Sequence, residues 1–186
     1  MRRFSFRPSL TLRGRAFKGL RGWAGKPLHP PLTDATIGIY TFATIAAVLS
    51  KVGIAEQKAA QGWTLALIVG LILSAPTALT GFADWLQIAR STPLWRTATA
   101  HMIAMLIATA FFLVAIGAGY SDGMDGAVAD GAFLLTLIGF FVLTVGGWLG
   151  GAIVFTYGMR VLNLVEEPAH RAVSPVPKPE EEAAEK

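Results

Sequence analysis

Three ionisable residues lie inside or beside long apolar stretches of this 186-residue chain, where such groups are costly and usually functional. His29 precedes the first stretch, Asp84 closes the second, and His101 lies about five residues after Arg96 at the start of the third. An imidazole oriented by a carboxylate is a good metal ligand or proton carrier, and two histidines from different helices can hold a haem iron axially. These residue types predict a cofactor, haem or a divalent metal, bound through His29 and His101, or a metal ion held by His29, Asp84 and His101.

Two other roles for the same residues stay open. Asp84 and His101 could form a structural clamp that ties helices together, in a protein of purely structural or assembly function. With Pro76, which can kink a helix, the intramembrane Asp84 also permits a small proton-linked transporter. His170 lies in a polar segment and is expected to be an ordinary solvated residue.

Enzymatic function has the least support. The chain contains no cysteine, which excludes disulfides, thiol catalysis and iron–sulfur ligation by its own residues. No HExxH zinc motif, nucleotide-binding glycine loop or nucleophile–base pair is visible. The chain is therefore more easily explained as a binding or structural protein than as an enzyme.

Four apolar stretches must position these residues. Hydrophobic residues make up 53% of the sequence and charged residues only 15%, against about 25% charged residues in a typical soluble domain. Each stretch has the roughly 20 residues that a helix needs to cross a bilayer. The sequence predicts an all-α integral membrane four-helix bundle with spans at about 34–54, 63–85, 97–120 and 132–157.

Aromatic residues fall near the ends of these predicted spans. Trp and Tyr are enriched at both membrane–water interfaces, where their rings sit at the level of the lipid headgroups. The pattern predicts an interfacial belt composed of Trp63, Trp85, Trp95, Tyr120 and Tyr157.

Basic residues predict the orientation of the bundle. Eight of the 16 Lys and Arg residues precede the first span, two lie between the second and third spans, and four follow the fourth. With both termini in the cytoplasm (N-in/C-in), 14 basic residues face inward and two, Lys51 and Lys58, face outward, which the positive-inside rule strongly favours. This orientation explains the net charge of +4 more simply than a nucleic-acid partner does. It also places His29, Asp34, Asp84 and His101 at the cytoplasmic end.

The predicted organisation has three parts. Residues 1–28 form a basic N-terminal arm, which either lies on an anionic membrane surface through Phe17, Leu20 and Trp23 or is disordered. Residues 29–162 form the transmembrane domain. Residues 163–186, rich in Pro, Glu and Ala, form a disordered polar tail.

The predicted fourth span carries two overlapping pairs of glycines four residues apart, Gly146 with Gly150 and Gly147 with Gly151. Such pairs expose backbone on one helix face and let another helix approach closely. The motif predicts close helix packing, either within the bundle or between two copies of the chain. A cofactor lying flat against this face is a third possibility.

These segments together resemble the DUF2231 family of predicted bacterial membrane proteins. The resemblance covers about residues 27 to 162. It is carried by Leu28 to Asp34, Gly81-Phe82-Ala83-Asp84, His101, and Gly146 to Gly151 running on through Phe155 to Gly158. It implies a multi-pass protein of the bacterial inner membrane. Some relatives occur with Rieske-type iron–sulfur domains, which implies redox partners. The family's motif positions fall on His29, Asp84, His101 and the glycines of the fourth span.

The leading functional hypothesis is therefore an accessory subunit in the bilayer, with a homo-oligomer or a redox membrane protein as partner, that binds haem or a metal at the cytoplasmic end.

Overall fold

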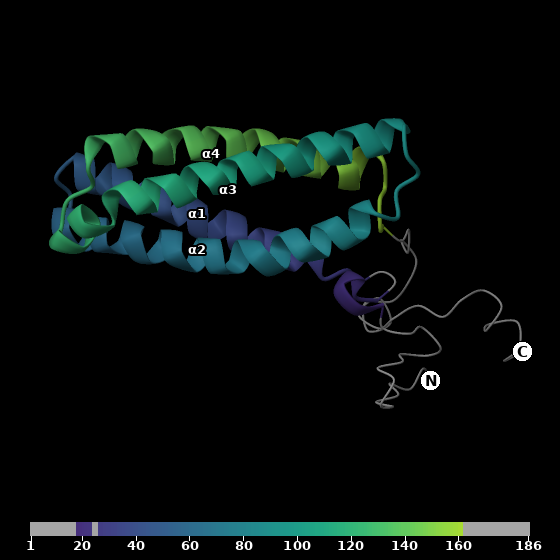
Figure 1. Ribbon diagram of the computed structural model, residues 1–186, viewed down its shortest axis with the longest axis horizontal. Coiled ribbons are helices and arrows are strands. Elements are labelled where there is room, and N and C mark those ends of the chain that lie inside the picture. The colour runs from purple at the N-terminus through teal and green to yellow at the C-terminus, as the bar shows by residue number, and fades with distance from the viewer. Residues whose placement is uncertain (1–17, 24–25, 162–186) are drawn as a thin grey trace, which may run out of the picture.

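The computed structural model describes residues 18–23 and 26–161, which form four long helices (Figure 1). These are α1 (His29–Lys51), α2 (Glu56–Trp85), α3 (Pro93–Asp125) and α4 (Asp130–Gly151). A short 3-10 helix, η1 (Gly19–Arg21), precedes α1, and a π-helical turn, η2 (Ala152–Thr156), continues α4. The described residues contain no strand. All four long helices, the last counted through Thr156, are long and apolar enough to cross a membrane, so the predicted four-span membrane fold is confirmed.

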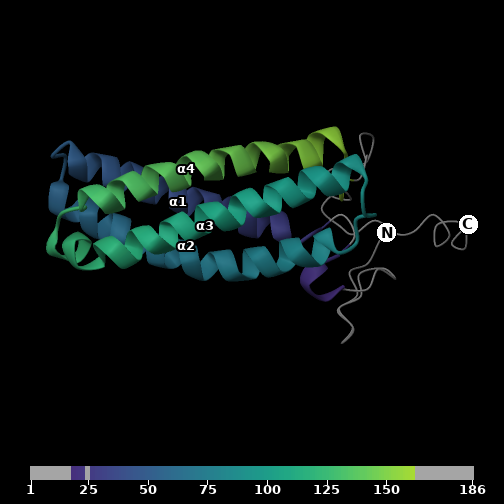
Figure 2. The same ribbon diagram turned by 45° about the horizontal axis from the view of Figure 1, so that its top comes forward.

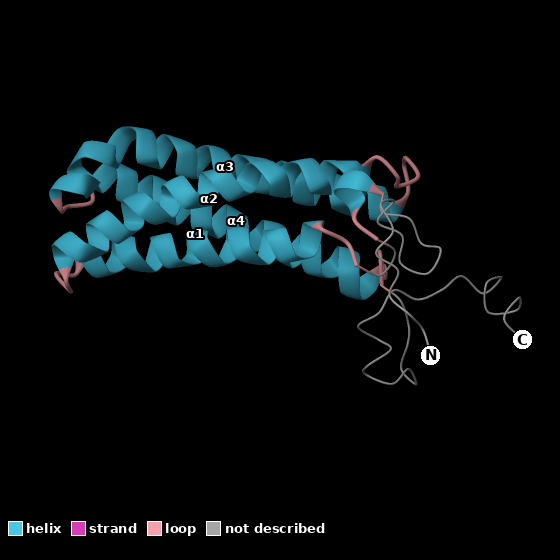
Figure 3. Ribbon diagram, turned by 90° about the horizontal axis from the view of Figure 1, so that it is seen from below, coloured by secondary structure: helices cyan, strands magenta, loops and turns pink. Residues whose placement is uncertain are grey.

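The helices run side by side along the bundle and are joined by short connections at its two ends (Figures 2 and 3). α1 packs mainly against α2 and α3 mainly against α4, while smaller contacts between α2 and α3 and between α1 and α4 close the bundle. We call the end that holds His29, Trp85, Pro93 and Thr156 the proximal end, since the described chain begins and ends there. The distal end holds Lys51, Glu56, Asp125 and Asp130.

Several helix boundaries differ from the prediction. α1 begins at His29 rather than near residue 34, with Pro30 and Pro31 in its first turn, where the missing proline N–H groups are not needed for helical hydrogen bonds. α3 continues through the predicted acidic loop to Asp125 and ends at Gly126, whose φ of 111° suits glycine. α2 runs on through Pro76 to Trp85.

The core is built from a few large side chains and the small residues opposite them. Tyr40, Trp63 and Phe112 are fully buried, and the rings of Tyr40 and Phe112 stack with centroids 4.1 Å apart. Gly70 makes this possible, because a β-carbon there would lie 2.5 Å from the Tyr40 ring.

One aromatic residue does not fit the predicted belt. Trp63 was expected at the membrane interface, but it is fully buried, and its indole N–H donates to the Thr136 hydroxyl at 3.0 Å. The first span was predicted to end near residue 54 and the second to begin near residue 63. In the structure, α1 ends at Lys51 and α2 already begins at Glu56. Seven residues into α2, Trp63 therefore faces the core.

Some predictions fall outside the described residues. The tail of residues 163–186, including His170, is not described, and neither are residues 1–17 of the basic arm. From Lys18 onward the arm is described except for residues 24–25, and its η1 turn contacts α2.

Candidate functional site

The first residue of α1, His29, is held against α2. Its Nδ1 lies 3.0 Å from the backbone carbonyl oxygen of Thr77. A carbonyl oxygen can only accept a hydrogen bond, so Nδ1 carries the proton and donates it. In the neutral ring, Nε2 then holds a lone pair. The Thr33 hydroxyl lies 3.4 Å from this nitrogen and donates to the His29 backbone carbonyl at 2.9 Å.

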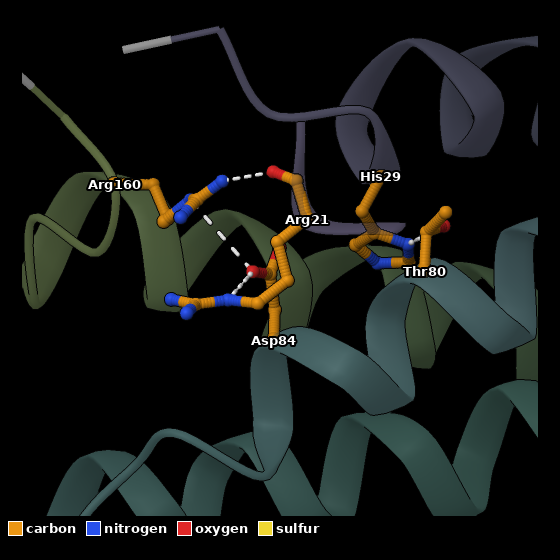
Figure 4. A network of polar contacts seen from close by, with 5 residues as sticks. All are labelled: Arg21, His29, Thr80, Asp84 and Arg160. Carbon is orange, nitrogen blue, oxygen red and sulfur yellow. Dashed lines mark hydrogen bonds and ion pairs between the residues drawn. The ribbon is translucent and has the colours of Figure 1, made fainter. Parts of the chain in front are cut away.

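Gly81 gives the His29 ring its space. One helical turn after Thr77, a β-carbon at position 81 would lie 2.6 Å from His29 Cε1 and 3.0 Å from Nδ1. The hydroxyl of Thr80 lies 3.4 Å from the same Nδ1 and donates its own proton to the carbonyls of Pro76 and Thr77. The histidine is therefore fixed in one orientation by backbone and packing together, as Figure 4 shows for its contact with Thr80.

His101 on α3 repeats this arrangement against α4. Its Nδ1 lies 2.8 Å from the carbonyl oxygen of Gly146 and must donate to it, which again leaves a lone pair on Nε2. Gly150 provides the space, because a β-carbon there would lie 3.1 Å from His101 Cε1. The Gly146–Gly150 pair thus lets α4 pack closely against the His101 ring, so that a backbone carbonyl of α4 can accept a hydrogen bond from it.

The two histidine rings lie close to each other. Their centroids are 6.4 Å apart and the ring planes are inclined by 78°. Both rings are partly buried. Sequence reasoning expected these imidazoles at the same depth, and the structure brings them together from helices 72 positions apart in the sequence.

Asp84 lies at the same end but faces other partners. Its carboxylate is buried, with 9% of the side chain exposed, and accepts a hydrogen bond from Arg21 Nε at 3.2 Å. Arg160 Nε lies 3.8 Å from the same oxygen, and a terminal nitrogen of Arg160 donates to the Arg21 backbone carbonyl. Figure 4 shows the two guanidinium groups side by side next to Asp84. One acid thus ties the segment before α1 and the segment after α4 to the end of α2.

The structure therefore divides the predicted cluster. His29 and His101 form one pair, and Asp84 belongs to a separate ion-pair network. Among residues 18–23 and 26–161, no group of three or more His, Asp or Glu side chains is placed to hold a metal ion. No hydrogen bond joins Asp84 to His101 within that part of the chain. Asp34 is exposed on α1 and has no side-chain contact of this kind in the described residues.

Sequence reasoning missed Arg21 and Arg160 as members of this end. Both had been counted only as orientation signals. The one available hint was that Asp84 is an acid within an apolar span and needs a cationic partner there. The hint does not say which of the nearby bases supplies it.

The four glycines of the two pairs in α4 have two different surroundings. Gly146 and Gly150 face α3, with Met105 and His101 as their nearest neighbours. A β-carbon on Gly147 would meet nothing within 4 Å, and one on Gly151 would meet only the Phe155 ring at 3.9 Å. The first pair therefore packs within the bundle, whereas the second lies on its outer surface.

The fold defines a multi-pass membrane protein whose polar groups gather at one end of a four-helix bundle. The family model for DUF2231, described as a predicted membrane protein, matches residues 25–163. The chain belongs to this family. No curated protein and no solved structure matches it.

Proposed function

We propose that this chain is an accessory subunit of the bacterial inner membrane that binds a metal centre, haem iron in first place, between His29 and His101 at the cytoplasmic end. The single observation that carries the proposal is the pair of imidazoles 6.4 Å apart, each with Nδ1–H given to a backbone carbonyl. Metal-binding histidines commonly donate their other ring N–H to a carbonyl or carboxylate, which fixes the ring and its tautomer. Both Nε2 atoms then have lone pairs suited to a metal.

The separation of the rings supports ligation from opposite sides of one metal. With metal–nitrogen bonds of about 2 Å, two imidazoles placed in line across a metal have centroids roughly 6 Å apart. Ligands at a tetrahedral angle would bring the centroids closer together. The observed 6.4 Å is thus compatible with His29 and His101 holding the same metal, which in haem would be its iron.

The donor set favours haem over a bare divalent ion. A divalent ion such as zinc takes about four protein or water ligands, and the described residues offer no third His, Asp or Glu at this place. A porphyrin supplies four nitrogens itself and asks the protein only for axial ligands. Haem iron held by two histidines exchanges single electrons, which fits an accessory role beside a redox partner.

The test is the absorption spectrum of the full-length protein purified in mild detergent after expression with a haem precursor supplied. We expect a Soret band and a stoichiometric amount of iron, and both should be lost in His29→Ala and in His101→Ala. His170→Ala is the matched control, because the third histidine of the chain lies outside the proposed site, and it should keep the band. A folded sample without Soret band or metal would contradict the proposal. Stoichiometric metal without a Soret band would show that the site binds a metal ion and not haem.

A second function is favoured by the same hydrogen bonds. His29 ties α1 to α2 and His101 ties α3 to α4, so the histidines could serve only to lock the bundle in a structural or assembly protein. In that case the wild-type protein carries neither haem nor metal. His101→Ala would then lower the thermal unfolding midpoint in detergent and leave any activity of the partner complex intact.

A further inference from the structure

The paired guanidinium groups of Arg21 and Arg160 form a second polar feature of the proximal end. We propose that they bind the phosphate group of an anionic phospholipid. The inference is independent of the histidine pair, because it needs neither haem nor a metal.

Charge is the first argument. Two guanidinium groups share one carboxylate, Asp84, so the cluster keeps a net positive charge. The neighbouring segments of the proximal end add four bases, Lys18, Lys26, Arg90 and Arg96, and one exposed acid, Asp34. Basic pockets between membrane helices on the cytoplasmic side are typical sites for anionic lipid headgroups.

The second argument is the number of unused hydrogen-bond donors. A guanidinium carries five N–H groups in a planar fork that fits phosphate oxygens. Arg21 uses its Nε on Asp84, and Arg160 uses one terminal nitrogen on the Arg21 carbonyl. Arg160 Nε is the one buried side-chain donor without a hydrogen bond in the described residues, and it lies 3.8 Å from the Asp84 carboxylate. Neither terminal nitrogen of Arg21 has a partner among the described residues. The terminal N–H groups of Arg21 are therefore the donors that phosphate oxygens would accept from.

The third argument is the surface beside the arginines. Leu86 follows the end of α2, Phe155 lies in η2, and Val161 comes directly after Arg160; their side chains are 54%, 89% and 54% exposed. Trp85 and Trp95 lie at the same end with ring centroids 5.9 Å apart, as expected at the headgroup level of a bilayer. Positive charge next to exposed apolar side chains fits a ligand with an anionic head and acyl chains. A free phosphate ion would use only the first of these features.

The test compares lipid binding by native mass spectrometry of the full-length protein released from detergent. Phosphatidylglycerol, phosphatidylcholine and inorganic phosphate are titrated separately, and the matched variants are Arg160→Gln and Arg96→Gln, the latter removing an exposed base at the same end. We expect wild type and Arg96→Gln to retain phosphatidylglycerol preferentially over phosphatidylcholine. Arg160→Gln should weaken phosphatidylglycerol binding about fivefold, which corresponds to the loss of about 1 kcal/mol for one basic residue near the membrane surface. Arg160→Lys should recover part of the loss.

Three results would overturn the proposal. Equal retention of phosphatidylglycerol and phosphatidylcholine by wild type would show that the site does not select an anionic headgroup. Equal weakening by Arg160→Gln and Arg96→Gln would reduce the effect to general surface charge. Binding of inorganic phosphate with the affinity of phosphatidylglycerol would show that the site recognises phosphate but not a lipid. Circular dichroism of Arg160→Gln shows whether its helices are intact, and Arg21→Gln provides the second variant if they are not.

Discussion

The two ends of the bundle use the same packing device for different purposes. At the distal end, Gly119 and Gly123 make room for the indole of Trp63, where a β-carbon on either would lie 2.8 Å or less from its nearest neighbour. At the proximal end, Gly81 and Gly150 make room for His29 and His101. The indole uses its only donor on Thr136, so the distal packing is chemically complete. Each imidazole donates from Nδ1 to a backbone carbonyl and keeps a lone pair on Nε2, which the proposed metal would use.

The ion pairs of the two ends also differ, in how deeply each carboxylate is buried. Lys51 Nζ lies 2.6 Å from Asp130 at the distal end, but the Asp130 side chain is 99% exposed. At the proximal end the contacts to Asp84 are longer, 3.2 and 3.8 Å, yet the carboxylate is only 9% exposed. Exposed pairs contribute little because water and salt screen them, whereas a buried charge depends on its partners. Burial rather than distance therefore decides which pair matters.

The largest effect is expected from Asp84→Asn. The change leaves two partly buried guanidinium groups without their counter-charge, and we expect the free energy of unfolding to fall by about 2 to 3 kcal/mol. Titration with sodium dodecyl sulfate, followed by circular dichroism, measures it. Asp34→Asn is the control, because Asp34 is an exposed acid of the same end and its replacement should change nothing. An Asp84→Asn protein as stable as wild type would mean that the arginines are solvated independently.

A smaller effect is expected from Gly81→Ala. The added β-carbon would lie 2.6 Å from the His29 ring and push the imidazole away from the Thr77 carbonyl. Overpacking of this kind costs about 1 to 2 kcal/mol, measurable by the same titration, and it should also lower the Soret absorbance per chain.

Gly117→Ala is the matched control for this substitution. Gly117 is exposed on α3, and a β-carbon there would meet nothing within 4 Å. Since alanine is the better helix former, its stability should equal or exceed that of wild type. Equal behaviour of the two alanine variants would refute the close packing of His29 on Gly81.

The smallest effect is expected from Lys51→Gln at the distal end. It removes the short contact to Asp130, but that acid is fully exposed. We expect an unfolding midpoint indistinguishable from that of wild type, at low and at high salt. A clear loss of stability at low salt would show that the two ends are more alike than their burial indicates.

The fold could be predicted because apolar run length is set by bilayer thickness, and the four runs are separated by polar residues. The helix ends could not be predicted, because hydropathy marks where the membrane ends and not where the helical backbone hydrogen bonds stop. The polar residues Ser121, Asp122 and Asp125 are still helical, and the helix end is set by Gly126. The misplaced Trp63 has the same origin, since seven helical residues, from Glu56 onward, precede it in α2 where the apolar run predicted none.

The site could be predicted in part. His29 and His101 were expected at the same depth, near the starts of the parallel helices α1 and α3, and their rings do lie 6.4 Å apart. The same argument applied to the antiparallel helices α2 and α3 would pair Asp84 with His101, and the described residues show no such contact. The partners of Asp84 could not be found in this way, because Arg21 lies in a single 3-10 turn and Arg160 in an irregular segment, and the path of both depends on local backbone geometry. Gly158 and Arg160 both have positive φ, 64° and 65°, and such turns aim a side chain in a direction that residue spacing does not encode.

The contacts of Arg160 join positions 139 residues apart in the sequence, which has a consequence for biogenesis. A chain emerging from the ribosome can insert its first three helices, and even pair Arg21 with Asp84, before residue 160 exists. The contact between Arg160 and Arg21 can form only after the last helix has been synthesised. A stalled or truncated product would lack this closure, and quality-control proteases could tell it from the finished protein by its loose proximal end.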